Sequence, residues 1–197
     1  MNKVILAGIL GGIAMFIWTA IAHMVLPLGE AGVSELSSEI PLLDAMNSSL
    51  KERGSGLFIF PGPHVSPKAT KQEKEEAIKQ MQERAASGPA GLLVYHPTRP
   101  IAFGRWLTIE FVTEVVQALL VVALLAQTRL TTFGGRVTFV TIAGILAAIT
   151  TNISYWNWYG FPKRYTVGYM FIEIVGFLIV GIVAAFVLRK QTSSTMA

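Results

Sequence analysis

The chain alternates long apolar segments with polar ones, and four of the apolar segments are about as long as a lipid bilayer is thick. They cover residues 4–27, 106–126, 137–155 and 165–188. Each comes close to the roughly 20 apolar residues that an α-helix needs to cross a hydrocarbon layer of about 30 Å. The pattern predicts an all-α membrane protein built on a bundle of four transmembrane helices.

Polar segments divide the chain into parts. The first transmembrane helix is expected within residues 1–28, a polar insert occupies 29–103, and the other three helices lie within 104–190. The short tail, residues 191–197, is polar and is expected to be cytoplasmic. The pattern therefore places a separate small domain between the first and second helices.

The insert reads as a small α/β domain because turn residues separate two helical and two strand-like segments. Its predicted elements are a helix at 34–52 with a possible interruption at Pro41, a strand at 56–60, a charged helix at 69–86 and a strand at 91–95. A core of this size contributes only a few kcal/mol of stability. The insert is therefore expected to pack against the membrane helices, a second copy of the chain or another subunit.

Composition supports a membrane protein. Hydrophobic residues make up 52% of the chain and charged residues 14%, whereas about 25% charged residues is usual in a soluble domain. The net charge is +4, but the basic residues collect beside apolar segments and form no continuous stripe, so the expected partner is the lipid bilayer and not a nucleic acid. The absence of cysteine excludes disulfides and thiol redox chemistry.

The distribution of Lys and Arg predicts the orientation of the chain. One side receives Lys3, Arg129, Arg136, Arg189 and Lys190, and the other side receives Lys163 and Arg164 in its short segments. Because cytoplasmic loops carry the excess of basic residues, both termini are expected in the cytoplasm and the insert outside it. The layout resembles that of small bacterial inner-membrane proteins, which implies a multi-pass protein of the inner membrane.

The first apolar segment also fits a cleavable secretory signal. Lys3 precedes it, and Ala20-Ile21-Ala22 forms a small-x-small pattern typical of cleavage sites. Its length and the presence of Trp18 favour a retained membrane helix.

Three carboxylates lie inside the predicted membrane helices. Glu110 and Glu114 are one helical turn apart, Gln117 follows on the same face, and Glu173 lies in the last segment. Charged side chains in hydrocarbon oppose insertion by about 2.5–3.5 kcal/mol each at the bilayer centre, so they usually face the bundle interior and mark a site. Two such carboxylates side by side need a proton, a cation or a basic side chain between them.

Other polar groups fall at a similar depth. His23 ends a stripe of the first helix that also contains Gly8, Gly12 and Thr19, while Asn152 and Tyr169 lie in the third and fourth helices. At 1.5 Å per residue, Glu114 and Glu173 both lie roughly 12 Å below the outer surface. The sequence therefore predicts one intramembrane polar site, formed by Glu110, Glu114, Gln117, Glu173, Asn152, His23 and Tyr169.

No cofactor is required by the sequence. Glu110, Glu114, Glu173 and His23 are chemically suitable ligands for Zn, Mn or Fe, so a metal stays an open alternative, although no Glu-x-x-His motif supports it. Nothing matches a phosphate loop, a Ser/His/Asp arrangement or a dinucleotide fingerprint, so an enzyme is not the favoured interpretation.

Two functions fit this pattern. The favoured one is a non-catalytic accessory or assembly subunit of a larger membrane complex, in which the carboxylates join helices and the partners are other membrane subunits or a second copy. The alternative is a small transporter or binding protein for a proton, a cation or a small polar solute.

Overall fold

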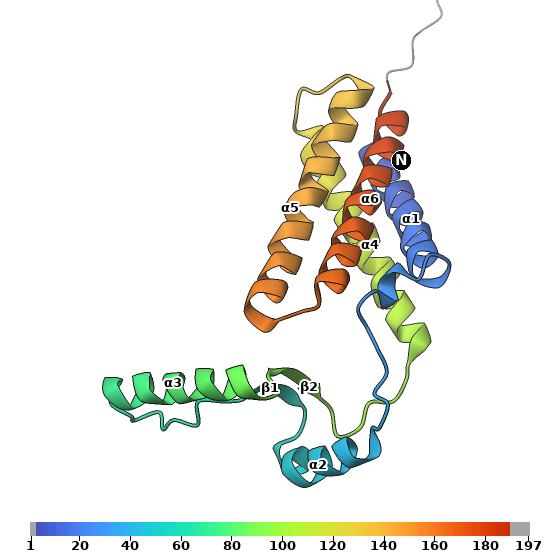
Figure 1. The fold of residues 1–197 in the computed structure, drawn as a ribbon. Coiled ribbons are helices and arrows are strands. Elements are labelled where there is room, and N and C mark those ends of the chain that lie inside the picture. The colour runs from blue at the N-terminus through green and yellow to red at the C-terminus, as the bar shows by residue number, and fades with distance from the viewer. Residues whose placement is uncertain (1–2, 190–197) are drawn as a thin grey trace, which may run out of the picture. The chain divides into compact units, whose positions relative to one another are not determined.

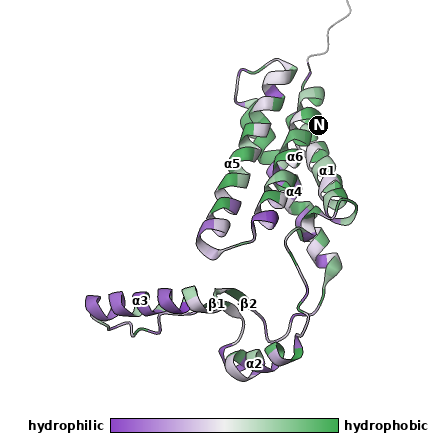
Figure 2. Cartoon of the chain, in the orientation of Figure 1, coloured by the Kyte–Doolittle hydropathy of each residue, from purple (hydrophilic) through white to green (hydrophobic). Residues whose placement is uncertain are grey.

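The computed structural model describes residues 3–189, which are mostly helical with one small sheet (Figure 1). Four of its helices are long, namely α1 (Lys3–Met24), α4 (Phe103–Ala126), α5 (Phe133–Tyr159) and α6 (Lys163–Val187). Each is long and apolar enough to cross a membrane, as Figure 2 illustrates. The predicted fold class is confirmed to that extent. The predicted polar tail, 191–197, lies outside the described residues.

The chain divides into two compact units. Unit 1 takes in the chain up to Ser34 and from Ala102 onward, and therefore holds all four long helices. Unit 2 is the segment Glu35–Ile101. The polar site predicted from the sequence falls wholly within unit 1.

In unit 1, α1 lies between α4 and α6, and α5 packs along α6. Glycines bring α1 and α4 together, because a Cβ atom on Gly12 would lie 2.5 Å from the Cα atom of Val115 and one on Gly8 would lie 2.9 Å from that of Leu119. The Gly-x-x-x-Gly spacing of α1 thus serves close helix approach, as predicted. The same helix meets α6 through the Trp18 Nε1–H group, which donates to the Ile172 carbonyl oxygen at 2.9 Å.

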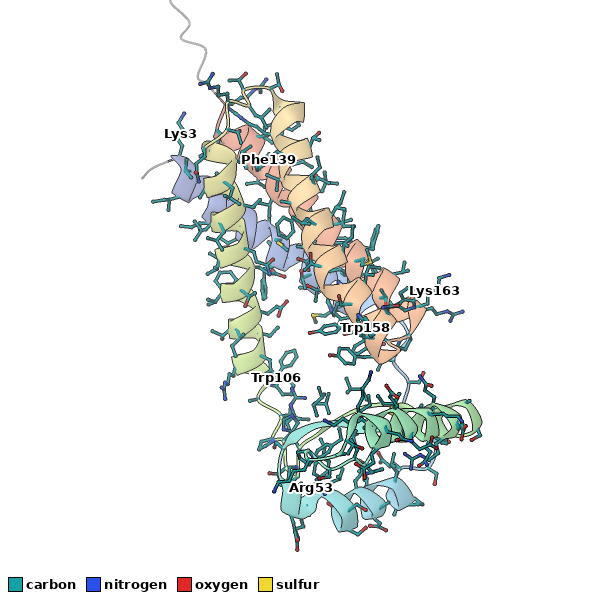
Figure 3. All side chains as sticks on the ribbon, turned by 90° about the vertical axis from the view of Figure 1, so that its left-hand side faces the viewer. Lys3, Arg53, Trp106, Phe139, Trp158 and Lys163 are labelled. Carbon is teal, nitrogen blue, oxygen red and sulfur yellow. The ribbon has the colours of Figure 1, made fainter. Side chains whose placement is uncertain are left out.

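The apolar core of unit 1 lies toward one end of the helices. Its buried residues are Ala7, Met15, Ala118, Val121, Val122, Leu125, Val140, Phe177, Val180 and Ala184. We call the opposite end, where α1 and α5 finish and α4 and α6 begin, the aromatic end; Figure 3 shows Trp106 and Trp158 there and Lys3 at the other. Glu114 and Glu173 each lie one helical turn closer to the aromatic end than the core residues Ala118 and Phe177.

Helix α5 extends beyond the predicted segment 137–155 at both ends. The Thr132 hydroxyl accepts a hydrogen bond from the Gly135 amide at 3.1 Å and caps the start of α5. Gly160, with φ of 69°, ends α5 in the left-handed conformation that glycine adopts without strain. Hydropathy detects only the apolar middle of a helix, so these caps decide where it ends.

Unit 2 contains both predicted strands. Strands β1 (Gly56–Phe60) and β2 (Gly91–Tyr95) pair antiparallel, with Phe58 opposite Leu93. Helix α2 (Ile40–Leu50) starts later than the predicted 34–52, because Pro41 lacks an amide hydrogen and is tolerated only in the first turn of a helix.

The sheet of unit 2 has one open apolar face. Antiparallel pairing puts Leu57, Ile59, Leu92 and Val94 on the same side. Leu57, Ile59 and Val94 are each about 60% exposed, at 61%, 58% and 62%. Tyr95 is the one buried hydrophobic residue that unit 2 contributes in the described part of the chain. This unit therefore has little core of its own.

Helix α3 (Lys71–Ser87) is held at its start by a capping box. The Glu73 carboxylate accepts hydrogen bonds from the Thr70 amide at 2.7 Å and the Thr70 hydroxyl at 2.8 Å, and the Glu73 amide donates back to that hydroxyl at 3.3 Å. These bonds to Thr70 lower the pKa of Glu73 below its usual value. The carboxylate form thus stabilises the first turn of α3.

The capping box makes the start of α3 sensitive to acid. A carboxyl group whose pKa is lowered by folding contributes stability above its unfolded pKa and loses it as the pH falls through the folded pKa. We expect the protection factors of the amides of residues 71–75 in hydrogen exchange to fall over that range. In Glu73→Ala, which removes the acceptor of the Thr70 amide and hydroxyl, they should be low already and nearly independent of pH; an unchanged pH response in that variant would contradict the assignment to Glu73.

Candidate functional site

Glu114 is the central residue of the candidate site. It lies on the face of α4 that points into unit 1 and is only 3% exposed. Its carboxyl group interacts with the Thr19 hydroxyl of α1, while its Oε2 atom is buried without a hydrogen-bond partner. A buried polar atom left unpaired costs about 1–3 kcal/mol, so native structures rarely retain one without a reason.

Two other carboxylates lie near Glu114. Glu110, one turn earlier on α4, and Glu173 of α6 are both close enough to interact electrostatically with the Glu114 carboxyl group. Glu110 also interacts with Glu173. The structure therefore brings together the three carboxylates that the sequence singled out, although it places Glu110 on the exposed side of the group.

The Lys and Arg side chains of the four long helices, Lys3, Arg105, Arg136, Lys163 and Arg164, all lie in the first turn of their helices. Residues 4–24, 106–128, 137–162 and 165–187 contain no Lys and no Arg. The ion pair of Lys71 with Glu75 lies on the surface of α3. The charges of three nearby carboxylates are therefore open to compensation by protons or by a bound cation.

His23 and Tyr169 form one wall near these groups. The His23 Nδ1–H group donates to the Thr19 carbonyl oxygen at 2.9 Å, one turn back on α1. Its ring meets the Tyr169 ring edge to face, with 5.9 Å between centroids. Tyr169 in turn interacts electrostatically with Glu110. These two predicted residues therefore lie at the same interface as the carboxylates.

Gln117 and Asn152 are placed differently. Gln117 is half-buried, one turn from Glu114, and its Oε1 atom is buried without a partner. Asn152 of α5 donates from Nδ2 to the Ala148 carbonyl oxygen of its own helix at 3.0 Å. The structure thus joins Gln117 to the group on α4, while Asn152 is engaged within α5, which packs on α6.

A chain of aromatic rings runs from the aromatic end of unit 1 toward the carboxylates. Successive ring centroids from Tyr159 through Tyr155, Phe161, Tyr165 and Tyr169 to His23 are 6.0, 5.3, 5.4, 4.3 and 5.9 Å apart. Tyr155 and Tyr159 are exposed, whereas Tyr165, Tyr169 and His23 are half-buried. The rings therefore connect the surface with the interior.

A metal site receives no support from the described residues. Within residues 3–189 no three His, Asp or Glu side chains are arranged so that they could hold a metal ion. This applies to the four proposed ligands Glu110, Glu114, Glu173 and His23, and His23 uses its Nδ1 atom within α1.

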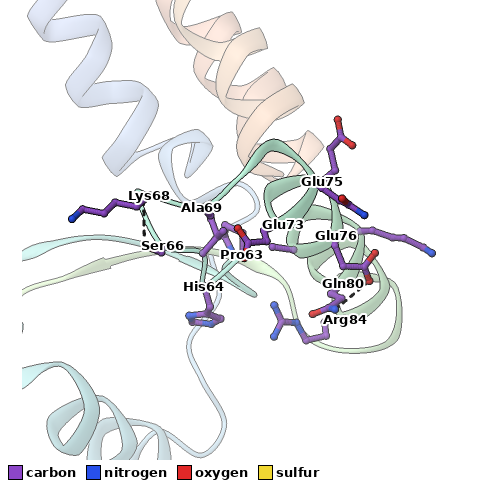
Figure 4. Close-up of a pocket in the computed structure, with 14 residues that line it drawn as sticks. Pro63, His64, Ser66, Lys68, Ala69, Glu73, Glu75, Glu76, Gln80 and Arg84 are labelled. Carbon is purple, nitrogen blue, oxygen red and sulfur yellow. Dashed lines mark hydrogen bonds between the residues drawn. The ribbon is translucent and has the colours of Figure 1, made fainter.

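Unit 2 offers a less specific alternative, an open hollow between α3 and the segment before it (Figure 4). Its rim carries side chains of both signs, including Glu76, Lys79 and Arg84, and the described residues that line it are not buried. Arg84, one of the residues that line it, donates from Nη2 to the Gly62 carbonyl oxygen at 2.7 Å. His64 lies at its edge and His96 contacts Ser55 instead, so the two loop histidines form no common site.

Sequence reasoning left two residues out of the site. The sequence places Thr19 on one face of the first helix with Gly8, Gly12 and His23, but it does not pair Thr19 with Glu114. That pairing depends on the packing of α1 against α4. Tyr165 stacks on Tyr169, one turn away on α6, which the i, i+4 spacing signals.

Comparison with known proteins gives no family for this chain. No family model matches it, and no match is found among the curated proteins or the solved structures.

Proposed function

We propose that the chain is an integral protein of the bacterial inner membrane that binds a proton or a small cationic solute at its intramembrane carboxylates. In this arrangement α1, α4, α5 and α6 cross the bilayer, both termini are cytoplasmic, and unit 2 lies outside. The excess of Lys and Arg near the termini and in the loop between α4 and α5 supports this orientation.

The observation that carries the proposal is the state of Glu114. It is buried, one of its oxygens has no partner, and two more carboxylates interact with it. The Lys and Arg residues of α4 and α6 stand in the first turn of each helix, nine or more residues before Glu114 or Glu173. A carboxylate that served only to join helices would be expected to have its hydrogen bonds satisfied within the bundle. The unpaired oxygen instead fits a carboxyl group whose partner is a bound proton or cation.

Glu114→Gln tests this proposal, because it keeps the shape of the side chain and removes its charge. We expect the purified wild-type protein to show a proton-binding step in its acid–base titration, followed by infrared spectroscopy of the carboxyl groups. That step should disappear in Glu114→Gln. Glu83→Gln, which changes an exposed carboxylate on α3, should leave it intact. A titration unchanged by Glu114→Gln, in a protein that still folds, would refute the proposal.

A second candidate is the accessory or assembly subunit, which the open face of the sheet in unit 2 favours. Leu57, Ile59, Leu92 and Val94 give this face an apolar surface that unit 2 does not cover in the described residues. In that role, Glu114 would stabilise the helix packing, and replacing it would lower the stability or abundance of the protein. The two candidates therefore predict opposite effects on stability.

A further inference from the structure

The unpaired atoms of the site specify what kind of group would complete it. Glu114 Oε2 and Gln117 Oε1 are both buried without partners, and both are hydrogen-bond acceptors. They lie three residues apart on α4 and therefore on the same face of the helix. A ligand that satisfies them must supply donor hydrogens, and the carboxylates beside them favour a ligand with a positive charge.

The aromatic rings distinguish an organic cation from a metal ion. The rings between Tyr159 and His23 form a continuous path of contacts, and Tyr169, near its inner end, interacts with Glu110. An ammonium group is attracted to the face of an aromatic ring by about 0.5–2 kcal/mol. A metal ion would need three or more closely placed ligands, and the described residues contain no such group of His, Asp or Glu.

Packing is loose where such a ligand would enter. Glu114 is the buried residue of α4 closest to the aromatic end, since residues 103–113 are all exposed. Helix α5 contributes no buried residue beyond Ala148. On α1 and α6, by contrast, Ala22, Thr166 and Ile172 are buried toward the aromatic end. The open side of the site is therefore the one formed by α4 and α5.

We propose that the site binds an alkylammonium ion, a primary or secondary amine in its protonated form, with its N–H groups on Glu114 and its charged end against the ring of Tyr169. The inference rests on the proposed function and narrows its ligand class. Glu110 and Glu173 supply additional negative charge. The aromatic rings between Tyr159 and Tyr169 line the approach of the cation to the site. Because Glu114 accepts hydrogen bonds, a quaternary ammonium ion without N–H groups binds more weakly at the same place.

Calorimetry on the purified full-length chain in lipid nanodiscs tests the proposal with n-butylammonium, tetramethylammonium and potassium ions. We expect n-butylammonium to bind in preference to the other two. Tyr169→Leu should weaken its binding by about two- to thirty-fold, the range that corresponds to a cation–π contact, while Tyr169→Phe should retain it. Phe171→Leu is the matched control, because Phe171 lies on the same helix but contacts Trp18 and is 50% exposed.

The outcomes separate this inference from the proposed function. If n-butylammonium does not bind while the Glu114-dependent titration persists, the amine proposal is overturned and the proton site stands. Equal binding of tetramethylammonium or potassium also overturns it, and this comparison needs only the wild-type protein. If Glu114→Gln leaves both the titration and amine binding unchanged, the proposed function fails as well.

Discussion

Gly12→Ala should strongly destabilise the protein, although the substitution adds a single methyl group. In an ordinary helix interior, replacing glycine by alanine stabilises by about 1 kcal/mol. Here the new Cβ atom would lie 2.5 Å from the Cα atom of Val115 and 3.0 Å from its backbone nitrogen. Backbone atoms cannot rotate away as a side chain can, so α1 and α4 must separate. Overpacking of this kind costs about 1–3 kcal/mol, and more where the backbone is involved.

The effect should extend beyond one interface, because α1 also packs against α6. Separation of α1 from α4 pulls Thr19 away from Glu114 and disturbs the contact of Trp18 with Ile172. The measurement is the melting temperature of the purified protein together with its yield as a single species in size-exclusion chromatography. We expect both to fall.

Gly134→Ala provides the control for helix propensity. Gly134 lies in the first turn of α5, and a Cβ atom there would meet no other atom within 4 Å. This variant should match the wild type or melt slightly higher. If Gly12→Ala behaves like Gly134→Ala, then α1 and α4 do not approach each other as closely as described. The contact of Thr19 of α1 with Glu114 would then be lost from the description of the site.

The sequence predicted which segments form helices and strands better than it predicted which of these elements pack against each other. The long apolar segments, the strands 56–60 and 91–95 and the Gly8–Gly12 spacing could all be identified, because length, alternation and small residues have direct local meanings. The order in which α1, α4, α5 and α6 pack could not. Helices that are apolar all round carry little information about which face meets which neighbour.

The candidate site shows the same division. The shared helix face of Glu110, Glu114 and Gln117 follows from their spacing alone. Whether Glu173 and Asn152 join that face depends on helix order, and the structure places the carboxylate near Glu114 but engages the amide within α5. The series of ring contacts from Tyr159 to His23 could not be predicted from the sequence. Phe161 contacts both Tyr155 and Tyr165 because Gly160 allows the turn between α5 and α6.

Glu114→Met should raise the stability of the protein while abolishing ligand binding. Methionine is unbranched and close in size to glutamate, and its side chain needs no hydrogen bond. The substitution removes the unpaired Oε2 atom and the charge that interacts with Glu110 and Glu173, at the expense of the contact with Thr19. A buried unpaired polar atom costs about 1–3 kcal/mol, so its removal should raise the melting temperature by about 2–4 °C for each kcal/mol gained.

The sign of this change decides between the two candidate functions. A carboxylate held open for a ligand is a local source of instability, and replacing it exchanges function for stability. A carboxylate that joins α1, α4 and α6 contributes to packing, so its loss would lower the melting temperature. Glu83→Met, the same substitution at an exposed position on α3, controls for the change in net charge. A lower melting temperature in Glu114→Met alone would favour the assembly subunit.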